Sequence, residues 1–313
     1  KIVSVSAMVE CSTRPNSIDK RQVMSIHGIL GEQTTDYPTK YSPETLYPID
    51  RSMGREAIGW QFDKPSIAKL SIGMDWWHAF EVSWLNTQGI SQVAMARFSI
   101  PATSLFIVES KSLKLYLNSI NFTEFASWDE VKTILSKDLS NCVQGEVKVE
   151  LFDLNNRDSE LLITQPKGVC IDDALADSDE KIALTSHPDA SLLKAKTQQS
   201  SRDSSQPFSF YSNILRSNCP VTNQPDWGTL AVEMSSAIEV DDARMLRYIL
   251  SFRQHNGFHE QCVEQIFADL SEFYQPTELM VRAWYTRRGG IDINPCRVSD
   301  ISLLPKPSRL IRQ

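Results

Sequence analysis

Two kinds of apolar spacing alternate along this chain. Stretches that are rich in apolar residues, or that have one at every second position, occur at 76–85, 92–108, 146–152, 229–234 and 278–285. This spacing is typical of β-strands. Stretches with apolar residues three and four positions apart occur at 109–119, 127–139, 241–250 and 258–274 and predict helices with one buried face. The pattern therefore predicts strands, two helices and strands, twice in succession.

Polar residues mark the ends of several of these elements. Asn86-Thr87-Gln88-Gly89 separates the first two strands and predicts a hairpin turn. Ser127-Trp128-Asp129-Glu130 has the form of a capping box, and Asp241 or Asp242 can cap the first helix of the second half. These signals agree with the apolar spacing. Together they indicate an α+β protein built from two halves of similar order.

Changes in composition suggest how the chain is divided. Met24 would be a sensible first residue, so we expect residues 1–23 to be a non-native or disordered extension. Residues 172–206 are crowded with Asp, Ser, Lys and Gln, which is typical of a solvated linker. The predicted units are a wrapping arm rich in Pro, Gly and Tyr at 24–70, a first domain at 71–171, the linker at 172–206, a second domain at 207–300 and a tail at 301–313.

The overall composition narrows the class of protein. The 313 residues are 41% apolar and carry a formal net charge of -7, with a pI near 5.4, which argues against a nucleic-acid binder that relies on a broad positive field. The six cysteines are irregularly spaced, which favours reduced thiols and a cytoplasmic protein over a disulfide framework. No apolar run approaches the roughly 20 residues that span a bilayer. We therefore expect no direct nucleic-acid or membrane partner.

The segment at 217–228 carries the most distinctive candidate chemistry. Its two prolines each fix φ and lack a backbone donor, so we expect neither a long helix nor a regular strand there. Cys219 and Asp226 lie seven positions apart, and a thiol with an acid nearby suits addition across a carbon–nitrogen multiple bond. A small buried cysteine and a turn aspartate are the alternatives. As an acid, Asp226 would need a raised pKa, which packing beside Trp227 could supply.

His259 and Glu260 open the helix predicted at 258–274. A carboxylate at a buried helix start could accept two N–H groups from the edge of a guanine-like base, a planar pairing that selects between rings. A core histidine, and an acidic residue favoured by the helix dipole, are the alternatives. Gly257 lies just before this helix, and because glycine has no side chain we expect the backbone that leads into the helix to be flexible.

Basic residues gather at two other element ends. The helix that begins with Glu109-Ser110-Lys111-Ser112-Leu113-Lys114 has two lysines on one face and could cradle a phosphate. Thr286-Arg287-Arg288-Gly289-Gly290 follows a strand and would suit a 2′-phosphate or a pyrophosphate. A solvated helix and a basic strand exit are the alternatives. No G-x-G-x-x-G, P-loop or zinc-ligand spacing occurs, so we expect no Rossmann unit and no metal.

Taken together, these motifs closely resemble those of the NADPH-dependent 7-cyano-7-deazaguanine reductases, the nitrile reductases of queuosine biosynthesis, in their long two-domain form. The matching segments lie at 109–114, 217–228, 258–262 and 286–295, and the likeness extends from about residue 41 to about residue 297. The resemblance implies two tandem tunnelling-fold (T-fold) domains, each an antiparallel sheet backed by two helices. It also implies a homodimer that acts on a small deazapurine.

The resemblance assigns a role to each candidate residue. Cys219 would attack the nitrile carbon to form a covalent thioimide, Asp226 would protonate the nitrogen, and His259 would assist proton transfer. Two NADPH molecules per turnover would deliver hydrides to give 7-aminomethyl-7-deazaguanine. The implied substrate contacts are Val108, Glu109, Ser110, His259 and Glu260, and the implied NADPH contacts are Ser110, Lys111, Arg288 and Gly289.

Two other functions stay open on the sequence alone. Another T-fold enzyme, such as a pterin-forming GTP cyclohydrolase, would have the same fold but would need a zinc site. A non-catalytic purine-binding module would keep the pocket and bind its ligand without forming a covalent bond.

Overall fold

The computed structural model of this protein describes residues 37–58, 70–155, 161–179, 181–183, 185–194 and 207–313. The expected extension at 1–23 and the start at Met24 lie outside these residues. So do residues 24–36 and 59–69 of the predicted arm and residues 180, 184 and 195–206 of the predicted linker.

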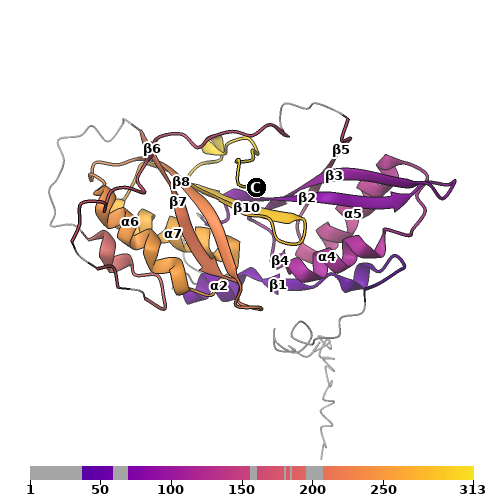
Figure 1. Ribbon diagram of the computed structural model, residues 1–313, viewed down its shortest axis with the longest axis horizontal. Coiled ribbons are helices and arrows are strands. Elements are labelled where there is room, and N and C mark those ends of the chain that lie inside the picture. Colours follow the sequence, from indigo (N-terminus) through magenta and orange to yellow (C-terminus); the bar gives the residue numbers. More distant parts are fainter. Residues whose placement is uncertain (1–36, 59–69, 156–160, 180, 184, 195–206) are drawn as a thin grey trace, which may run out of the picture. The chain divides into compact units, whose positions relative to one another are not determined.

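Among the described residues, eight strands form one continuous sheet (Figure 1). The strand order is β5-β3-β2-β10-β9-β8-β7-β6, and every neighbouring pair is antiparallel except β6 and β7. The strands are β2 (Gly73–Leu85), β3 (Ser91–Pro101), β5 (Lys148–Phe152), β6 (Val169–Cys170), β7 (Phe208–Asn218), β8 (Pro225–Ser235), β9 (Glu278–Tyr285) and β10 (Ile291–Val298). Outside this sheet, β1 (Pro48–Asp50) pairs with β4 (Phe106–Val108).

The two halves of the chain meet in the middle of the sheet. β2 belongs to the first half and β10 closes the second, and their antiparallel ladder runs from the pair Gly73 and Arg297 to the pair Ala79 and Ile291. The predicted α+β class with two tandem halves is confirmed, and the two half-sheets are fused edge to edge. This fusion brings together side chains that are more than 200 positions apart, such as Asp75 and Arg297, which are separated by 222 positions.

Helices of the described residues cover one face of this sheet (Figure 1). α4 (Ser110–Ser119) and α5 (Trp128–Val143) pack on the first half, and α6 (Asp242–Ser251) and α7 (His259–Tyr274) pack on the second. All four are at the predicted positions. Fully burying one leucine or isoleucine from such a stripe contributes about 1.5–3 kcal/mol. The first core includes Trp77, Phe98, Leu113 and Leu135, and the second includes Leu230, Ile249, Ile266 and Val281.

The C-terminal tail lies on the opposite face of the sheet from these helices (Figure 1). It begins with a short 3-10 helix, η5 (Ile301–Leu303). Arg282 Nη1 and Trp284 Nε1 of β9 donate hydrogen bonds to the carbonyls of Lys306 and Ser308, at 2.9 and 3.1 Å. Leu310 is buried against Trp284. The predicted tail is therefore packed against the sheet.

The described parts of the predicted arm and linker also contribute ordered elements. Residues 37–58 form η1 (Pro43–Thr45), β1 and a short helix, α2 (Arg51–Ala57). In the linker, η3 (Ala190–Leu193) buries Leu193 in the second core. Nearby, Thr185 donates a hydrogen bond to the carbonyl of Ser251, at the end of α6. The domain boundaries proposed from composition stay predictions.

Several local signals behave as the sequence predicts. Asn86 N donates to Ile90 O at the first hairpin turn. Ser127 accepts a hydrogen bond from Glu130 N, but the Glu130 carboxylate accepts from Ala126 N instead of from Ser127, so the box is shifted by one residue. Asp241 caps α6 by accepting a hydrogen bond from Arg244 N.

The expectation for residues 217–228 is wrong in one respect. β7 continues through Asn218 and β8 begins at Pro225, so that only residues 219–224 form an irregular turn. The register pairs Ser217 with Asp226 and Asn218 with Pro225. The prolines are compatible with this hairpin because they lie in the turn and at the first position of a strand, where no ladder donor is needed. The strands at β6, β7 and β10 were not predicted.

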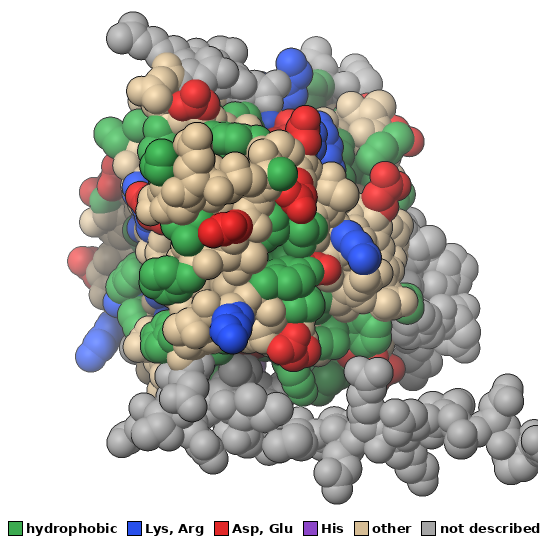
Figure 2. Space-filling model, turned by 90° about the vertical axis from the view of Figure 1, so that its right-hand side faces the viewer, with side chains coloured by type: hydrophobic (Ala, Val, Ile, Leu, Met, Phe, Trp, Pro, Cys, Tyr) green, Lys and Arg blue, Asp and Glu red, His purple; other side chains and the backbone are tan. Residues whose placement is uncertain are grey.

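The surface carries no broad field of one sign on the face drawn in Figure 2, where acidic, basic and apolar side chains of the described residues are interspersed. This agrees with the modest net charge of -7. Within the part of the chain that the structure describes, no helix combines the length and the apolar character needed to cross a membrane. The five cysteines in the described residues are free thiols.

Candidate active site

The hairpin between β7 and β8 holds Cys219 at its turn. Cys219 N donates to Gln224 O, and Asn223 N donates to Cys219 O, both at 2.9 Å. Asn223 has φ of 54°, a left-handed conformation that asparagine tolerates better than most residues. Because the two strands pair antiparallel, the turn brings Cys219 and Asp226 to the same end of the sheet. A bend does unite them, as predicted, and the bend is a hairpin.

The Cys219 sulfur lies among hydrogen-bond donors. Burial by itself raises the pKa of this thiol. Hydrogen bonds from the hydroxyl and N–H of Thr222, from the N–H of Val221 and from the Arg288 side chain outweigh that effect, so the pKa of Cys219 lies below its usual range. A larger fraction of the sulfur is therefore thiolate, the nucleophilic form, near neutral pH. Among the described residues, the buried thiols Cys262 and Cys296 show the opposite effect, since burial raises their pKa to about 12.

Asp226 is buried and bound by two cationic or potentially cationic groups. Arg288 Nε lies 2.9 Å from one carboxylate oxygen, and His259 Nε2 lies 3.3 Å from the other. The expected packing of Trp227 beside this carboxylate is not found. Trp227 is 38% exposed and Asp226 only 4%, because successive side chains of a strand point to opposite faces. Arg216 packs over the Trp227 ring at 5.3 Å instead.

The first turn of α7 presents His259 and Glu260. The His259 ring stacks on Tyr285, with ring centroids 3.9 Å apart and planes 15° apart, so the imidazole is held in one orientation. Glu260 is 3% exposed, and its Oε1 atom has no hydrogen-bond partner among the described residues. Burial and the neighbouring charge of Asp75 raise the pKa of Glu260 to about 7, against the smaller lowering effects of His259 and Arg51.

These groups line one narrow cavity. It contains about 320 Å³ of empty space, of which about 20 Å³ is wide enough for the centre of a water molecule. A purine-sized ring therefore enters only if side chains move, and Arg288 is the most exposed of the charged groups paired there. Seven of the residues predicted for the site line this cavity: Val108, Ser110, Cys219, Asp226, His259, Glu260 and Arg288.

Three of the predicted residues lie elsewhere. Glu109 is buried, and its carboxylate caps α4 by accepting hydrogen bonds from Lys111 N and Ser112 N at 3.0 and 2.7 Å. Lys111 follows on the same helix and does not line the cavity. Gly289 lies on the other side of Arg288 and lines a second, wider groove. Their predicted contacts with ligands stay predictions.

The second groove adjoins the first cavity at the turn between β9 and β10. Arg288 lines the cavity, and Gly289 and Gly290, both with positive φ, line the groove, which contains about 1160 Å³ of empty space against about 320 Å³ in the cavity. Lys114 lies against this turn: a Cβ added at Gly289 would lie 3.1 Å from Lys114 Cε. Burial and the charge of Arg288 lower the pKa of Lys114. Of the two lysines of the predicted cradle, Lys114 is the one that reaches this groove.

The sequence did not single out the walls of the cavity. Trp77 and Ile293 close it from β2 and β10, and Phe258 closes it from the start of α7. Their residue types do not distinguish a cavity wall from an ordinary core position. Gly257 also lines it, and the flexible approach expected from this glycine stays a prediction. A Cβ at this position would lie 2.7 Å from His255 Nε2, so a side chain would fit here only if the His255 ring moved.

Among the described residues, no group of three or more His, Cys, Asp or Glu side chains is arranged to hold a metal ion. The donor set of the cavity instead combines a thiol, a carboxylate, an imidazole and a guanidinium. The groove combines an ammonium group with glycine backbone that a ligand can approach closely, which suits a phosphate-bearing ligand.

Comparison with known families agrees with this geometry. A family described as "Nitrile reductase, 7-cyano-7-deazaguanine-reductase N-term" matches residues 37–151, and one described as "QueF-like protein" matches residues 225–301. The first match ends at the end of β5 and contains Val108 and Ser110. The second begins at Pro225 and contains Asp226, His259, Glu260 and Arg288.

Individual relatives extend the likeness over most of the chain. A protein of Psychrobacter cryohalolentis named NADPH-dependent 7-cyano-7-deazaguanine reductase is 76% identical over 290 residues, which is 93% of this chain and all of the relative. Proteins of the same name from Acinetobacter baylyi and Acinetobacter baumannii are 50% and 48% identical, with the same coverage. The resemblance inferred from the motifs is confirmed: this chain belongs to the NADPH-dependent 7-cyano-7-deazaguanine reductase family.

Proposed function

We propose that this chain reduces the nitrile of 7-cyano-7-deazaguanine to an aminomethyl group with two molecules of NADPH, through a covalent thioimide on Cys219, as a step of queuosine biosynthesis. The observation that carries the proposal is the convergence of three groups in one cavity. A thiol with a lowered pKa, a carboxylate paired with an imidazole, and a buried carboxylate with an oxygen that lacks a hydrogen-bond partner all line it. The names of the relatives support the choice of substrate.

Glu260 is suited to recognise the base. A guanine-like edge carries a ring N–H and an exocyclic amine side by side, and a carboxylate can accept both in one plane. Glu260 should bind such an edge much more tightly than a ring without these donors. Its Oε1 atom has no partner among the described residues, and a buried acceptor left unpaired costs about 1–3 kcal/mol. Only the ionised form of Glu260 can accept both hydrogen bonds.

Cys219 and Asp226 are suited to the first chemical step. The thiolate forms a bond to the nitrile carbon, one π pair of the C≡N group moves to nitrogen, and that nitrogen takes a proton from Asp226. In the present conformation Arg288 is bound to Asp226 at 2.9 Å. Arg288 must therefore leave the carboxylate before Asp226 can reach the substrate. The same movement would widen the cavity.

Bound NADPH would supply the two hydrides. The bond from Cys219 keeps the carbon in place for the first reduction and breaks when the thiolate leaves, and the cavity walls then retain the imine until the second. His259, held by its stack on Tyr285 and its contact with Asp226, can return a proton to that carboxylate. The adjoining groove, with Lys114, Gly289 and Gly290, fits the phosphate groups of such a cofactor.

The partners are proposals of the same kind. We expect a cytoplasmic homodimer with no direct contact to nucleic acid or membrane. Light scattering at several protein concentrations can test whether the protein is a dimer. The two alternative functions make different predictions. A cyclohydrolase-like enzyme requires a stoichiometric metal, and a non-catalytic purine-binding module binds the ligand without a change in protein mass.

Intact-mass measurement separates these functions. After mixing with 7-cyano-7-deazaguanine in the absence of NADPH, we expect the mass of the protein to increase by the full mass of the ligand, because addition to the nitrile loses no atom. The Cys219→Ala variant should show no increase, while Cys262→Ala, which removes another thiol, should react normally. An unmodified wild-type protein that nevertheless binds the ligand would favour the binding module.

A further inference from the structure

Helix α2 packs directly against the turn that carries Glu260. Gly54 of α2 faces Gln261, and a Cβ at residue 54 would lie 2.5 Å from the Cγ and Nε2 atoms of Gln261. Gln261 in turn accepts a hydrogen bond from Phe258 N at the start of α7. The predicted wrapping arm is therefore in close contact with the first turn of α7, where His259 and Glu260 line the cavity.

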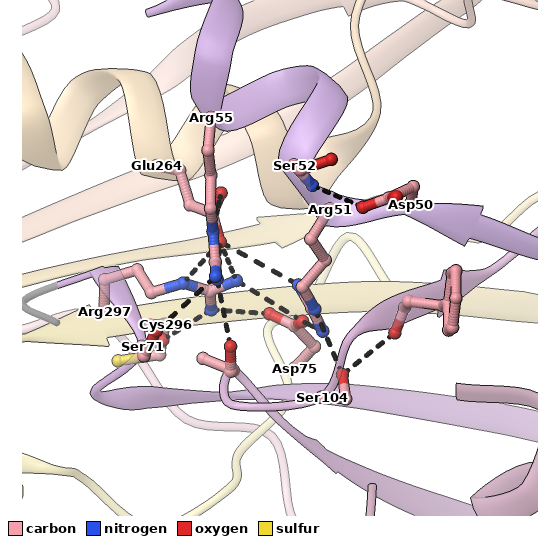
Figure 3. Close-up of polar contacts among 12 residues, drawn as sticks. Asp50, Arg51, Ser52, Arg55, Ser71, Asp75, Ser104, Glu264, Cys296 and Arg297 are labelled. Atoms are coloured by element: carbon pink, nitrogen blue, oxygen red, sulfur yellow. Dashed lines mark hydrogen bonds and ion pairs between the residues drawn. The ribbon is translucent and has the colours of Figure 1, made fainter. Parts of the chain in front are cut away.

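The same contact contains a buried cluster of five charged residues (Figure 3). It comprises Arg51 and Arg55 of α2, Asp75 of β2, Glu264 of α7 and Arg297 of β10, all at most 5% exposed. Arg297 links the two carboxylates, with Nη1 2.6 Å from Asp75 and Nη2 2.8 Å from Glu264. Arg51 reaches Asp75 at 2.7 Å, and Arg55 reaches Glu264 at 2.9 Å.

The charges of this cluster do not balance. Three guanidinium groups face two carboxylates, which leaves one positive charge in a buried environment where charges interact strongly. The Nη1 atom of Arg51 lies 3.8 Å from Glu264 Oε1, an ion-pair distance, but has no hydrogen-bond partner among the described residues. Glu264 lies one helical turn after Glu260 on the same side of α7, so the cluster adjoins the Glu260 carboxylate. The neighbouring negative charge that would balance the cluster is Glu260 itself.

We propose that Arg51 is a positioning residue for the ligand site, whose charge favours the ionised form of the neighbouring Glu260, the form that can accept hydrogen bonds from a ligand. That the ligand is a deazapurine rests on the proposed function; the effect of Arg51 on Glu260 does not. Arg51 itself does not line the cavity and acts through Glu260.

The charged groups around Glu260 shift its pKa in different directions. Burial and the charge of Asp75 raise the pKa of Glu260, whereas His259 and Arg51 lower it. Cys219, Asp226 and Arg288 line the same cavity from the β7–β8 hairpin and the β9–β10 turn. Glu264 and Arg297 complete the cluster on the side of α7 and β10. Removal of Arg51 and removal of Asp75 must therefore shift the ionisation of Glu260 in opposite directions.

The test measures the ionisation of Glu260 directly in the unliganded, full-length protein. Carbon NMR of protein with labelled glutamate carboxyls reports the midpoint of each titration, and Glu260→Gln identifies the relevant signal. We expect Arg51→Gln to raise the midpoint by about one pH unit, the low end of the effect of a close opposite charge. Asp75→Asn should lower it, Arg51→Lys should leave it close to wild type, and Arg55→Gln should move it less than Arg51→Gln.

The double variant protects the test against a failure to fold. Arg51→Gln with Asp75→Asn removes one charge of each sign, so its midpoint should lie above that of Asp75→Asn alone. An unchanged midpoint in Arg51→Gln, an equal shift in Arg55→Gln, or a midpoint in the double variant no higher than in Asp75→Asn would overturn the proposal. General damage to the structure would not move the midpoint in opposite directions in the two single variants.

Ligand binding then separates this inference from the proposed function. In the Cys219→Ala background, which prevents the covalent step, the dissociation constant for 7-cyano-7-deazaguanine at pH 7 should rise about 5-fold in Arg51→Gln, since less Glu260 is ionised. The difference should shrink above pH 9, where Glu260 is ionised in both proteins. Absence of binding at every pH in Cys219→Ala would contradict the proposed substrate, while the NMR midpoints would still decide the role of Arg51.

Discussion

Replacement of Glu260 by glutamine should make the folded protein more stable at alkaline pH while it removes ligand recognition. The reason is that Glu260 is buried with an oxygen that no described residue binds, and its pKa is raised from 4.5 to about 7. A carboxyl group whose pKa is higher in the folded state binds its proton more tightly there than in the unfolded chain. Its ionisation therefore opposes folding.

The size and the pH range of this effect follow from the two pKa values. Below pH 4.5 the group is protonated in both states and costs nothing. Between pH 4.5 and 7 the folded state binds more protons than the unfolded state, so stability falls as pH rises. Above pH 7 the full cost is present, roughly 3 kcal/mol for a difference of about 2.5 pH units at about 1.4 kcal/mol each. Glutamine has no such ionisation.

Urea unfolding of wild type and Glu260→Gln at pH 5 and pH 8 measures this difference. We expect the advantage of the variant to grow by roughly 2–3 kcal/mol between the two pH values. Glu264→Gln is the matched control, one turn away on α7 and equally buried. Burial raises the pKa of Glu264, but the charges of Arg297, Arg55 and Arg51 outweigh it, so that pKa is lowered.

Glu264 should therefore behave differently. Its ionised form stabilises the fold above the unfolded pKa, and that contribution is lost as pH falls through the folded pKa. Both assay pH values lie above the unfolded pKa of 4.5, so the deficit of Glu264→Gln should be nearly the same at pH 5 and pH 8. If the advantage of Glu260→Gln is the same at both pH values, or if both variants lose stability in parallel as pH rises, the reasoning about Glu260 is wrong.

Three further predictions concern other parts of the site. Thr222→Ala should raise the midpoint of Cys219 alkylation by iodoacetamide by about half a pH unit to one unit, because a net hydrogen bond contributes about 1 kcal/mol; Thr222→Ser should keep the wild-type midpoint, and an equal shift in both would contradict the role of the hydroxyl. Gly54→Ala should weaken ligand binding while unfolding free energy changes by less than about 1 kcal/mol, since the Cβ displaces Gln261 but alanine favours the helix; normal binding would show that this contact does not hold the first turn of α7. Lys114→Ala should raise the KM for NADPH about tenfold with a smaller change in kcat, as expected for a charge-assisted hydrogen bond to phosphate, and an unchanged KM would show that Lys114 makes no such bond to the cofactor.

The helices and several strands could be predicted because burial has a local signature. α7 and β9 have nearly the predicted bounds, since each presents one apolar face at its own period. β10 was missed for a physical reason. It contains Asp292, Asn294 and Pro295, residues that argue against a central strand, and it is nevertheless fully buried between β2 and β9. Its polar groups find partners far away in the chain, such as His78 for Asp292 at 2.8 Å.

The candidate site divides in the same way. The residue types in four motifs were sufficient to identify the family and to name seven residues of the cavity. Lys111 and Lys114 share a face of α4, and only the packing of that helix beside the β9–β10 turn decided that Lys114 lines the groove next to Gly289. The motif also did not show that the carboxylate of Glu109 turns back to cap α4, because a side-chain conformation depends on its surroundings in the fold.

By itself, the sequence determined the four main helices, several of the strands, the family and the identity of the reactive groups, because these depend on residue type and on short-range spacing. Only the tertiary structure decided how charges from distant segments meet. Arg55 and Glu264 are 209 positions apart, and Asp75 and Arg297 are 222 positions apart, yet they share one buried cluster beside Glu260. The strength of an electrostatic interaction depends on distance and on burial, and neither is encoded in the spacing of residues along the chain.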